Sequence, residues 1–456
     1  MALNKLVAGT SASDPLASTG ADVAAVVNGL VDAVGIQYNP LNIYTLPYWL
    51  PAPAYAASTA YTAGQAVTNA GNTYVCLTGG TTGASSAPTA TTNNPITDGT
   101  VSWLYFGTAP TALAGAPTVT VVGSTPAGQT KLVLTDVAES WYNIKGGVYT
   151  FGTNGPEWNL NVEPKNALGY FVEFMTDSVD FTLRFRYGTV PIRFTVDGRF
   201  VSPSVLSASG DNRFRFQFTG ERKVRKIGFF WSGSNSFYGI QLNPVDSVWK
   251  PAAEGAVNLF VVGDSYIGGS NFHPATTERG IHHIVANAIG CKNYQADGVG
   301  GSGYISAGSE TPFGSATRLA RVNLNSNVIV VLGGINDTLT GLQAAVVSYL
   351  SSLRARCPRA LIVVGGVYAG VSGPDATTLN KEQAIKDAVT QANDSRIVFM
   401  PISSAISPWI SGTGRVSATN NSGNSDLYQS PDGTHPIAQA TEYYAGRILA
   451  FLSNSI

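Results

Sequence analysis

The sequence predicts a multidomain protein whose C-terminal part is a doubly wound, three-layer α/β domain, preceded by a β-sandwich or jelly roll and a small N-terminal β module. The length of 456 residues exceeds what one ordinary core organises, so several domains are expected. From about residue 117 to 248, short stretches place an apolar side chain at every second position, which indicates half-buried strands. Beyond residue 250, near-continuous apolar runs alternate with helical stretches, as in a buried parallel sheet.

Changes in composition and periodicity divide the chain into four segments. Residues 1–50 are expected to be an attachment or oligomerisation segment with a short helix, and residues 51–112 a small β module. Residues 113–250 are assigned to the sandwich or jelly roll, and residues 251–456 to the α/β domain. Before Lys131 the only basic residue is Lys5, so the leading part differs sharply in composition from the rest.

Two patterns stand out in the first 112 residues. Valine and leucine at helical spacing over 23–34 predict a short amphipathic helix, whose apolar face packs on this chain, on another copy or on a neighbouring protein. A Gly- and Asn-rich stretch contains aromatic residues at intervals, namely Tyr61, Tyr74 and Trp103. It resembles the small chitin-binding-like β modules of carbohydrate-active and phage tail proteins. The alternative is that these aromatic residues are simply the core of a tiny domain.

The central segment has the strand signals of a sandwich or jelly roll. Alternation is clearest over 181–187 and 213–218, and Asp197-Gly198 between two apolar runs predicts a two-residue hairpin. The outward positions carry arginines, which form a solvated face or, alternatively, recognise an anionic glycan: Arg184, Arg186, Arg213 and Arg215.

The last 200 residues predict the α/β domain. Buried parallel strands are expected over 257–262, 327–332, 360–364 and 396–400. Helices are expected around 276–289, 340–356, 376–393 and 436–452. In such folds ligands bind at the carboxyl ends of the strands, so the active site is expected there.

Composition limits the classes of partner. Only 12% of residues are charged and the net charge is −1, so neither nucleic acid nor a membrane surface is an expected partner. Cys76, Cys291 and Cys357 lack the spacing of a disulfide framework or a zinc site, and no metal is expected. The N-terminus has no apolar run typical of a signal peptide, and no segment is long and apolar enough for an ordinary membrane helix.

A candidate nucleophile follows the first apolar run of the α/β segment. Ser265 lies in Gly263-Asp-Ser-Tyr, where flanking glycines permit a tight turn. A serine hydroxyl needs a base, and the best placed histidine is His435, in Ser-Pro-Asp-Gly-Thr-His-Pro. Asp432, three residues earlier, can hold Nδ1–H of that histidine, and Pro436 suits the first turn of the closing helix.

Two further loops offer donors for an oxyanion. The glycine-rich loop 298–304 follows the expected second strand and can present a backbone N–H, and Asn336 follows the third. Other residues beside these motifs are expected to line the pocket: Asp264, Tyr266, His273 and Asp337.

Together these motifs resemble the four consensus blocks of the SGNH (GDSL-type) hydrolase superfamily, over about residues 255–456. The resemblance implies a flavodoxin-like SGNH fold and a serine esterase that needs no cofactor. It assigns the nucleophile to Ser265, the base pair to His435 and Asp432, and the oxyanion donors to Ser265, Gly301 and Asn336. A small register shift would put Gly300 or Gly303 in the place of Gly301.

The order of the segments is similar to that of carbohydrate esterases that remove O-acetyl groups from polysaccharides, carried on phage tail fibres or tailspikes. This similarity implies an acetylated capsule or O-antigen as substrate and a virion or extracellular location. It also implies other tail proteins as partners of the N-terminus, and a homotrimer. Alternatives are a secreted acetylxylan-type or short-chain esterase, and a glycan-binding tail adhesin with a vestigial hydrolase domain.

Overall fold

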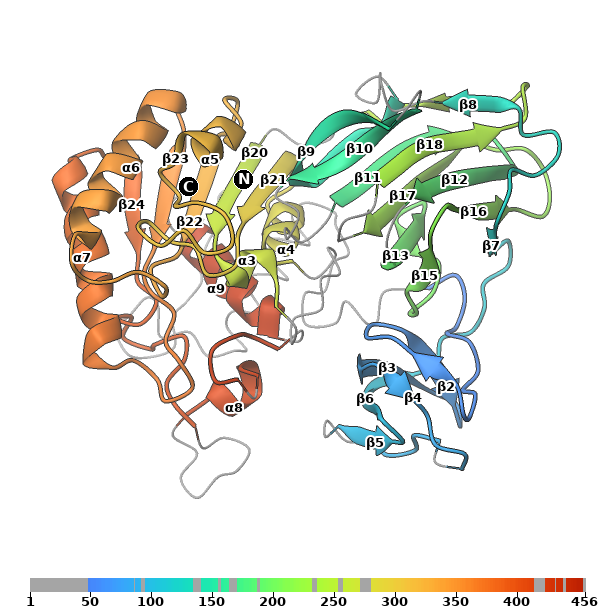
Figure 1. Ribbon diagram of the computed structural model, residues 1–456, viewed down its shortest axis with the longest axis horizontal. Helices are drawn as coiled ribbons and strands as arrows, with labels where there is room; N and C mark the ends of the chain where they lie inside the picture. The colour runs from blue at the N-terminus through green and yellow to red at the C-terminus, as the bar shows by residue number, and fades with distance from the viewer. Residues whose placement is uncertain are drawn as a thin grey trace.

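A computed structural model gives the arrangement of most of the chain. It describes residues 48–85, 87–91, 95–133, 141–154, 157–163, 170–186, 189–231, 236–252, 257–270, 280–413, 423–430, 432–437 and 440–453. The helix expected over 23–34 and the pocket residue His273 lie outside the described residues. In Figure 1 the α/β part lies on the left, a two-sheet β part on the upper right and a small β module below it.

The α/β part is built on a five-stranded parallel sheet. The strand order is β21-β20-β22-β23-β24, so the chain reverses its direction of winding at β20, whose end carries Ser265. Reversal points of this kind are where ligands bind in doubly wound sheets. The strands are β20 (Val257–Gly263), β21 (Cys291–Gly298), β22 (Val328–Leu332), β23 (Leu361–Gly365) and β24 (Ile397–Met400).

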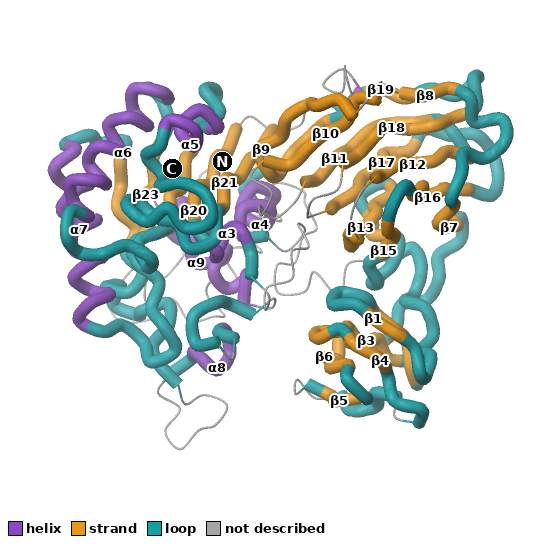
Figure 2. Tube along the Cα trace, in the orientation of Figure 1, coloured by secondary structure: helices purple, strands orange, loops and turns teal. Residues whose placement is uncertain are grey.

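Helices cover both faces of this sheet, as Figure 2 shows. Alternate side chains of β20 enter the two cores: Leu259 and Val261 pack toward one layer of helices, and Phe260 and Val262 toward the other. The first layer contains α4 (Ile281–Ala288) and α9 (Ala440–Ser453). The second contains α5 (Ala316–Arg321), α6 (Leu342–Arg356) and α7 (Ala376–Ala392).

The closing helix begins later than the sequence suggests. Pro436 was expected in its first turn, but it forms an isolated β-bridge with Gln429, and α9 starts at Ala440. Two backbone bonds hold the turn out of the helix, from Ser430 N to His435 O at 2.8 Å and from Ile437 N to Tyr428 O at 3.0 Å. The expectation of a helical Pro436 is therefore wrong.

Two antiparallel sheets face each other in the central part. One has the order β9-β11-β17-β13-β15, and the other runs β7-β16-β12-β18, with β8 and β10 beside β18. Aromatic rings from both sheets meet between them, as in the pairs Phe174–Phe181 at 5.9 Å and Phe185–Phe229 at 5.4 Å between ring centroids. The strands are β7 (Thr118–Val122), β8 (Lys131–Val133), β9 (Asn143–Asn154), β10 (Glu157–Glu163), β11 (Tyr170–Thr176), β12 (Asp180–Arg186), β13 (Thr189–Val196), β14 (Arg199–Phe200), β15 (Leu206–Ser209), β16 (Asn212–Gln217), β17 (Arg225–Trp231), β18 (Ser236–Leu242) and β19 (Val248–Trp249).

The predicted Asp197-Gly198 hairpin is confirmed. These residues connect β13 to β14, with Val196 paired to Arg199, and both have positive φ, at 51° and 78°. Two central residues with positive φ are the signature of a type I′ turn. On the outer face of the same part, the expected arginines engage carboxylates, with Arg184 on Asp211 and Arg215 on Asp180.

The two-sheet part and the α/β part share a continuous sheet. Strand β9 pairs with β11 and also runs parallel to β21, with Gly146 opposite Gln295 and Gly147 opposite Ala296. His283 of α4 packs edge-on against Phe230 across this junction, with ring centroids 4.9 Å apart.

The small module uses its aromatic residues as a core. Trp103 is fully buried, and Tyr61 packs edge-on against it at 5.0 Å between centroids. The carboxylate of Asp98 accepts hydrogen bonds from the indole of Trp103 and the hydroxyl of Tyr55. Its strands are β1 (Ala60–Tyr61), β2 (Ala66–Asn69), β3 (Asn72–Thr78), β4 (Gly80–Thr81), β5 (Ile96–Asp98) and β6 (Val101–Thr108). Across the described part of the chain, no helix is long and apolar enough to cross a membrane.

Candidate active site

Ser265 lies at the tight turn between β20 and the short helix α3 (Ser265–Gly268). Asp264 caps this helix, because its Oδ1 accepts the backbone N–H of Tyr266 at 2.9 Å. The turn requires glycine at two positions. A Cβ at Gly263 would lie 2.4 Å from Ile267 Cγ1, and one at Gly268 would lie 2.7 Å from Gly298 O. The sequence therefore allows the end of β21 to press closely against the turn that presents the hydroxyl.

The structure brings the three residues of the predicted triad together. His435 Nε2 lies 2.9 Å from Ser265 Oγ, although 170 positions separate them, and His435 Nδ1 lies 2.6 Å from Asp432 Oδ2. With Nδ1–H directed at the carboxylate, Nε2 is left to accept the serine proton. Both side chains of the pair remain accessible, with 26% of His435 and 31% of Asp432 exposed.

Hydrogen bonds within the same turn hold Asp432 ionised. Its Oδ1 accepts the Ser430 hydroxyl at 2.7 Å and the backbone N–H groups of Thr434 and His435 at 2.9 Å each. Partial desolvation works to raise the pKa of Asp432, but the hydrogen bonds from His435, Ser430 and Thr434 outweigh it and hold the pKa well below its usual range. The carboxylate therefore remains charged in mildly acidic solution.

The turn that carries His435 is anchored to its surroundings. The hydroxyl of Tyr266, the neighbour of the serine, hydrogen-bonds the carbonyl oxygen of Thr434. Val371 N donates to Gly433 O at 2.8 Å from the loop after β23. The ring of Tyr266 is stacked on Tyr368, with centroids 4.0 Å apart, so this anchor is itself fixed by packing.

Two of the candidate oxyanion donors lie at the neighbouring strand ends. Gly301 has a φ of +72°, which favours glycine, and its carbonyl accepts the hydroxyl of Ser306 at 2.9 Å. Asn336 Nδ2 donates to Ser302 O at 3.0 Å and lies 3.4 Å from Oδ2 of Asp264, the residue before the serine. The amide of Asn336 thus bridges the glycine-rich loop and the nucleophile turn.

Three residues expected to line a pocket lie beneath the site instead. Asp264 and Tyr266 are completely buried and Asp337 is 3% exposed. The carboxylate of Asp337 accepts three successive backbone N–H groups, from Tyr304 at 2.9 Å and from Ile305 and Ser306 at 2.8 Å each. Asp337 thus turns inward, because the loop needs an acceptor there.

Asp337 also accounts for one of the glycines in this loop. A Cβ at Gly303 would meet the Asp337 carboxylate at 2.3 Å, so the close approach of that side chain explains Gly303 without any role in catalysis.

Burial has a large effect on Asp264. Removal of its carboxyl group from water raises its pKa to about 7, although the hydrogen bond from Tyr266 N–H opposes this shift. Asp264 therefore changes its charge near neutral pH, next to the nucleophile.

Sequence reasoning missed a buried ion pair under the same loops. Arg318 and Asp297 are each 1% exposed, with Arg318 Nε 2.8 Å from Asp297 Oδ2. Neither residue belongs to a recognisable motif, and only the charged residue just before the Gly298 loop hints at the pair.

Among the residues that the structure describes, no group of three or more His, Cys, Asp or Glu side chains could hold a metal ion.

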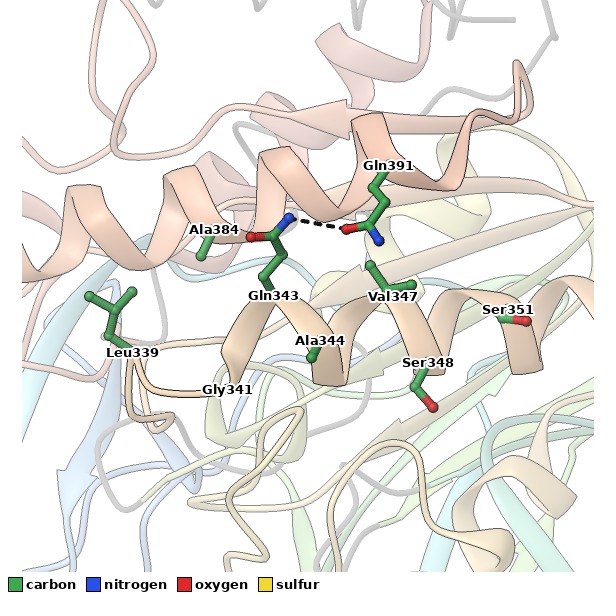
Figure 3. A pocket seen from close by; sticks show the side chains of 9 residues that line it. All are labelled: Leu339, Gly341, Gln343, Ala344, Val347, Ser348, Ser351, Ala384 and Gln391. Carbon is green, nitrogen blue, oxygen red and sulfur yellow. Dashed lines mark hydrogen bonds between the residues drawn. The ribbon is translucent and has the colours of Figure 1, made fainter.

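A surface groove of about 860 Å³ lies between α6 and α7 (Figure 3). Gln343 and Gln391 bridge it with a hydrogen bond of 3.1 Å. Its lining contains none of the triad or oxyanion residues.

Comparison with known proteins identifies the fold. No protein-family model matches the sequence, and no curated protein matches it. Among solved structures, an active-site mutant of a family two carbohydrate esterase from Clostridium thermocellum aligns with a TM-score of 0.53 at 14% identity, over 69% of this chain and 98% of that one. The chain has the fold of these esterases.

Two further structures support this assignment. The same type of Clostridium thermocellum esterase in complex with cellohexaose gives a TM-score of 0.51 at 15% identity, over 68% of this chain and 98% of that one. A salicylyl-acyltransferase from a tetracycline biosynthetic pathway gives 0.50 at 14% identity, over 74% and 97%. The likeness in fold extends over about 70% of the chain, more than residues 251–456 for which the SGNH-type fold was expected, and the jelly-roll assignment stays a prediction.

Proposed function

We propose that the protein is a serine-dependent carboxylic ester hydrolase. The observation that carries this proposal is the chain of contacts from Asp432 Oδ2 through both ring nitrogens of His435 to Ser265 Oγ, at 2.6 Å and 2.9 Å. A serine hydroxyl becomes a useful nucleophile when a base takes its proton and a carboxylate orients that base. The arrangement fits acyl transfer through a covalent acyl-serine.

The reaction proceeds in two halves. Ser265 Oγ attacks the ester carbonyl while His435 Nε2 accepts its proton, and Asp432 stabilises the imidazolium that results. His435 then returns the proton to the alcohol oxygen as the carbon–oxygen bond of the ester breaks. Water attacks the acyl-serine with His435 again as base, which releases the carboxylic acid and restores the serine.

The negative charge that develops on the carbonyl oxygen needs donors. The backbone N–H groups of Ser265 and Gly301 and the side-chain amide of Asn336 are the proposed set. The contact of Asn336 with Asp264 is long, at 3.4 Å, and an oxyanion would replace it as the second acceptor of the amide. Each such donor typically contributes about 10²–10³ in kcat.

The proposed substrate is an O-acetylated bacterial surface polysaccharide. The likeness in fold to carbohydrate esterases supports an acyl group carried on a sugar. The partial exposure of His435 and Asp432 supports a substrate that approaches from outside, since an ester on a long chain cannot enter a closed cavity. Attachment to a phage tail fibre or tailspike, through residues 1–50 and as a trimer, remains part of this proposal and rests on sequence composition.

Acetate release from purified acetylated polysaccharides tests the proposal. Wild-type protein should release acetate, and Ser265→Ala should abolish release while the circular dichroism spectrum and melting temperature stay unchanged. Ser351→Ala, an exposed serine on α6, is the matched control and should behave as wild type. Activity that survives Ser265→Ala would overturn the assignment. Tight binding of glycan without turnover by wild type would favour an adhesin with a vestigial hydrolase domain.

A further inference from the structure

One buried side chain contacts two of the three strand-end segments that carry the proposed oxyanion donors, and Ser302 links it to the third through Asn336. Arg318 lies on α5, is 1% exposed, and its guanidinium is stacked over the ring of Phe313 at 4.7 Å from the centroid. The mechanism proposed above does not use it. A fully buried arginine is rare unless its donors are satisfied, so the positions of its acceptors are informative.

The acceptors come from three different places in the chain. Nη2 donates to the carbonyl oxygen of Gly263 at 3.2 Å and to that of Asp297 at 2.9 Å, at the ends of β20 and β21. Nε donates to the carboxylate of Asp297 at 2.8 Å. Nη1 donates to Ser302 Oγ at 2.8 Å and to Thr311 O at 3.3 Å, in the glycine-rich loop and the segment that follows it.

Two of these contacts, at Gly263 and Ser302, lie beside the proposed donors. Gly263 precedes the nucleophile turn and therefore fixes the start of the segment that carries the Ser265 N–H. Ser302 directly follows Gly301, and its own carbonyl oxygen accepts Asn336 Nδ2 at 3.0 Å. Ser302 Oγ also donates to Val299 O at 2.7 Å, so the hydroxyl both receives Arg318 and closes the loop.

A guanidinium suits this task better than an ammonium. Its donors are fixed in one plane, so a single group can hold several acceptors at set angles and distances. Lysine carries the same charge but cannot reach a carbonyl of β20, the carboxylate of Asp297 and the hydroxyl of Ser302 at once.

We propose that Arg318 is a positioning residue of the oxyanion hole, holding the Ser265, Gly301 and Asn336 donors in a single fixed arrangement. This inference rests on the proposed esterase function. Arg318 would act on the stabilisation of the transition state, because the donors it aligns meet the substrate oxygen most strongly when that oxygen becomes charged.

The chain offers a matched control for this proposal. Arg321 lies one turn along α5 and also contacts Asp297, with Nη1 3.2 Å from Oδ1, and it pairs with Glu310. These contacts join Arg321 to two acidic side chains, whereas those of Arg318 include the carbonyl of Gly263 and the hydroxyl of Ser302. A variant of Arg321 therefore disturbs the same ion cluster while it keeps the bonds of Arg318 to Gly263 and Ser302.

The test compares Arg318→Lys, Ser302→Ala and Arg321→Gln with wild type in hydrolysis of p-nitrophenyl acetate. Arg318→Lys should lower kcat about 10²-fold with KM within about threefold, because small displacements of catalytic groups are that costly and a loss confined to the transition state lowers kcat rather than raising KM. Ser302→Ala should lower kcat about fivefold, as for one lost hydrogen bond. Arg321→Gln should stay within about threefold of wild type.

The outcomes distinguish failure of the Arg318 proposal from failure of the proposed esterase function. If Arg318→Lys does not fold, as judged by circular dichroism and melting temperature, the smaller Ser302→Ala change decides the question through its kcat. Folded variants of Arg318 and Ser302 with kcat within twofold of wild type would overturn the proposal, as would an Arg321→Gln loss equal to that of Arg318→Lys. An inactive wild-type protein would instead refute the esterase function itself.

Discussion

The two sides of the candidate site are built in opposite ways. On the base side, Asp432 and His435 lie within four residues of each other, partly exposed, in a turn whose bonds are mostly internal. On the oxyanion side, the donors come from three strand ends. The buried side chains of Arg318, Asp337 and Asp264 hydrogen-bond the loops and the amide on that side. The base side is a local motif, whereas the oxyanion side exists only once the sheet has formed.

The largest expected effect concerns the base side. Asp432→Asn should lower kcat by about 10⁴, because the asparagine amide cannot hold His435 in the tautomer that leaves Nε2 free. The measurement is steady-state hydrolysis of p-nitrophenyl acetate, with KM as the internal check on binding. Loss of less than tenfold would show that the exposed turn orients His435 without its carboxylate.

A second prediction addresses the buried carboxyl of the oxyanion side. The pKa of Asp264 is raised in the folded state to about 7, above its unfolded value near 4, so its contribution is fully favourable below pH 4 and is lost as pH rises toward 7. The free energy of unfolding should therefore fall by about 4 kcal/mol across that window, since each tenfold change in proton affinity corresponds to ~1.4 kcal/mol.

Asp264→Asn should remove this part of the pH dependence. Urea unfolding of both proteins at pH 4.5 and pH 8 gives the change in stability of each, and the difference between the two proteins cancels the other titrating groups. Parallel pH dependence in the two proteins would contradict the raised pKa.

The third prediction concerns the side-chain amide of Asn336 as a hydrogen-bond donor to the oxyanion. Asn336→Ala should lower kcat 10²–10³-fold with little change in KM, because the amide is needed most when the carbonyl oxygen carries charge. Asn336→Asp keeps the size of the side chain but removes the donor, and should be as impaired. An unaltered kcat in either variant would exclude Asn336 from the oxyanion hole.

The smallest expected effect links the two sides. Tyr266→Phe removes only the hydroxyl that hydrogen-bonds Thr434 O, and it keeps the stacking on Tyr368. We expect kcat to fall about fivefold, the equivalent of one hydrogen bond. A variant indistinguishable from wild type would mean that the internal bonds of the Asp432–His435 turn suffice to place the imidazole.

The same contrast explains what the sequence could predict. The triad was predictable because its members stand in short motifs: Ser265, Asp432 and His435. The parallel sheet was predictable because four of its five strands are apolar runs. Strand β21 was not predicted as an apolar run, since Cys291–Gly298 carries polar residues and lies between β20 and β9 rather than between two strands of the α/β domain.

Long-range partners account for what was missed. Glu382 on α7 is completely buried, and its carboxylate accepts backbone N–H groups of Val367, Ile402 and Ser403. Like Asp337 and Arg318, it hydrogen-bonds backbone groups that are distant in sequence. No regular spacing in the sequence connects such residues to their partners. Pro436 shows the converse error: this good helix-start residue lies in a β-bridge with Gln429, because its neighbours His435 and Ile437 hydrogen-bond Ser430 and Tyr428.

In the proposed mechanism Ser265 forms the acyl intermediate. The most direct measurement treats the protein with a fluorophosphonate probe and locates the adduct by peptide mass spectrometry, with His435→Ala in parallel. We expect a single adduct on the peptide containing Ser265 in wild type and little labelling in the variant, because His435 no longer activates the serine. An adduct on another residue, or full esterase activity in a protein whose Ser265 stays unlabelled, would contradict it.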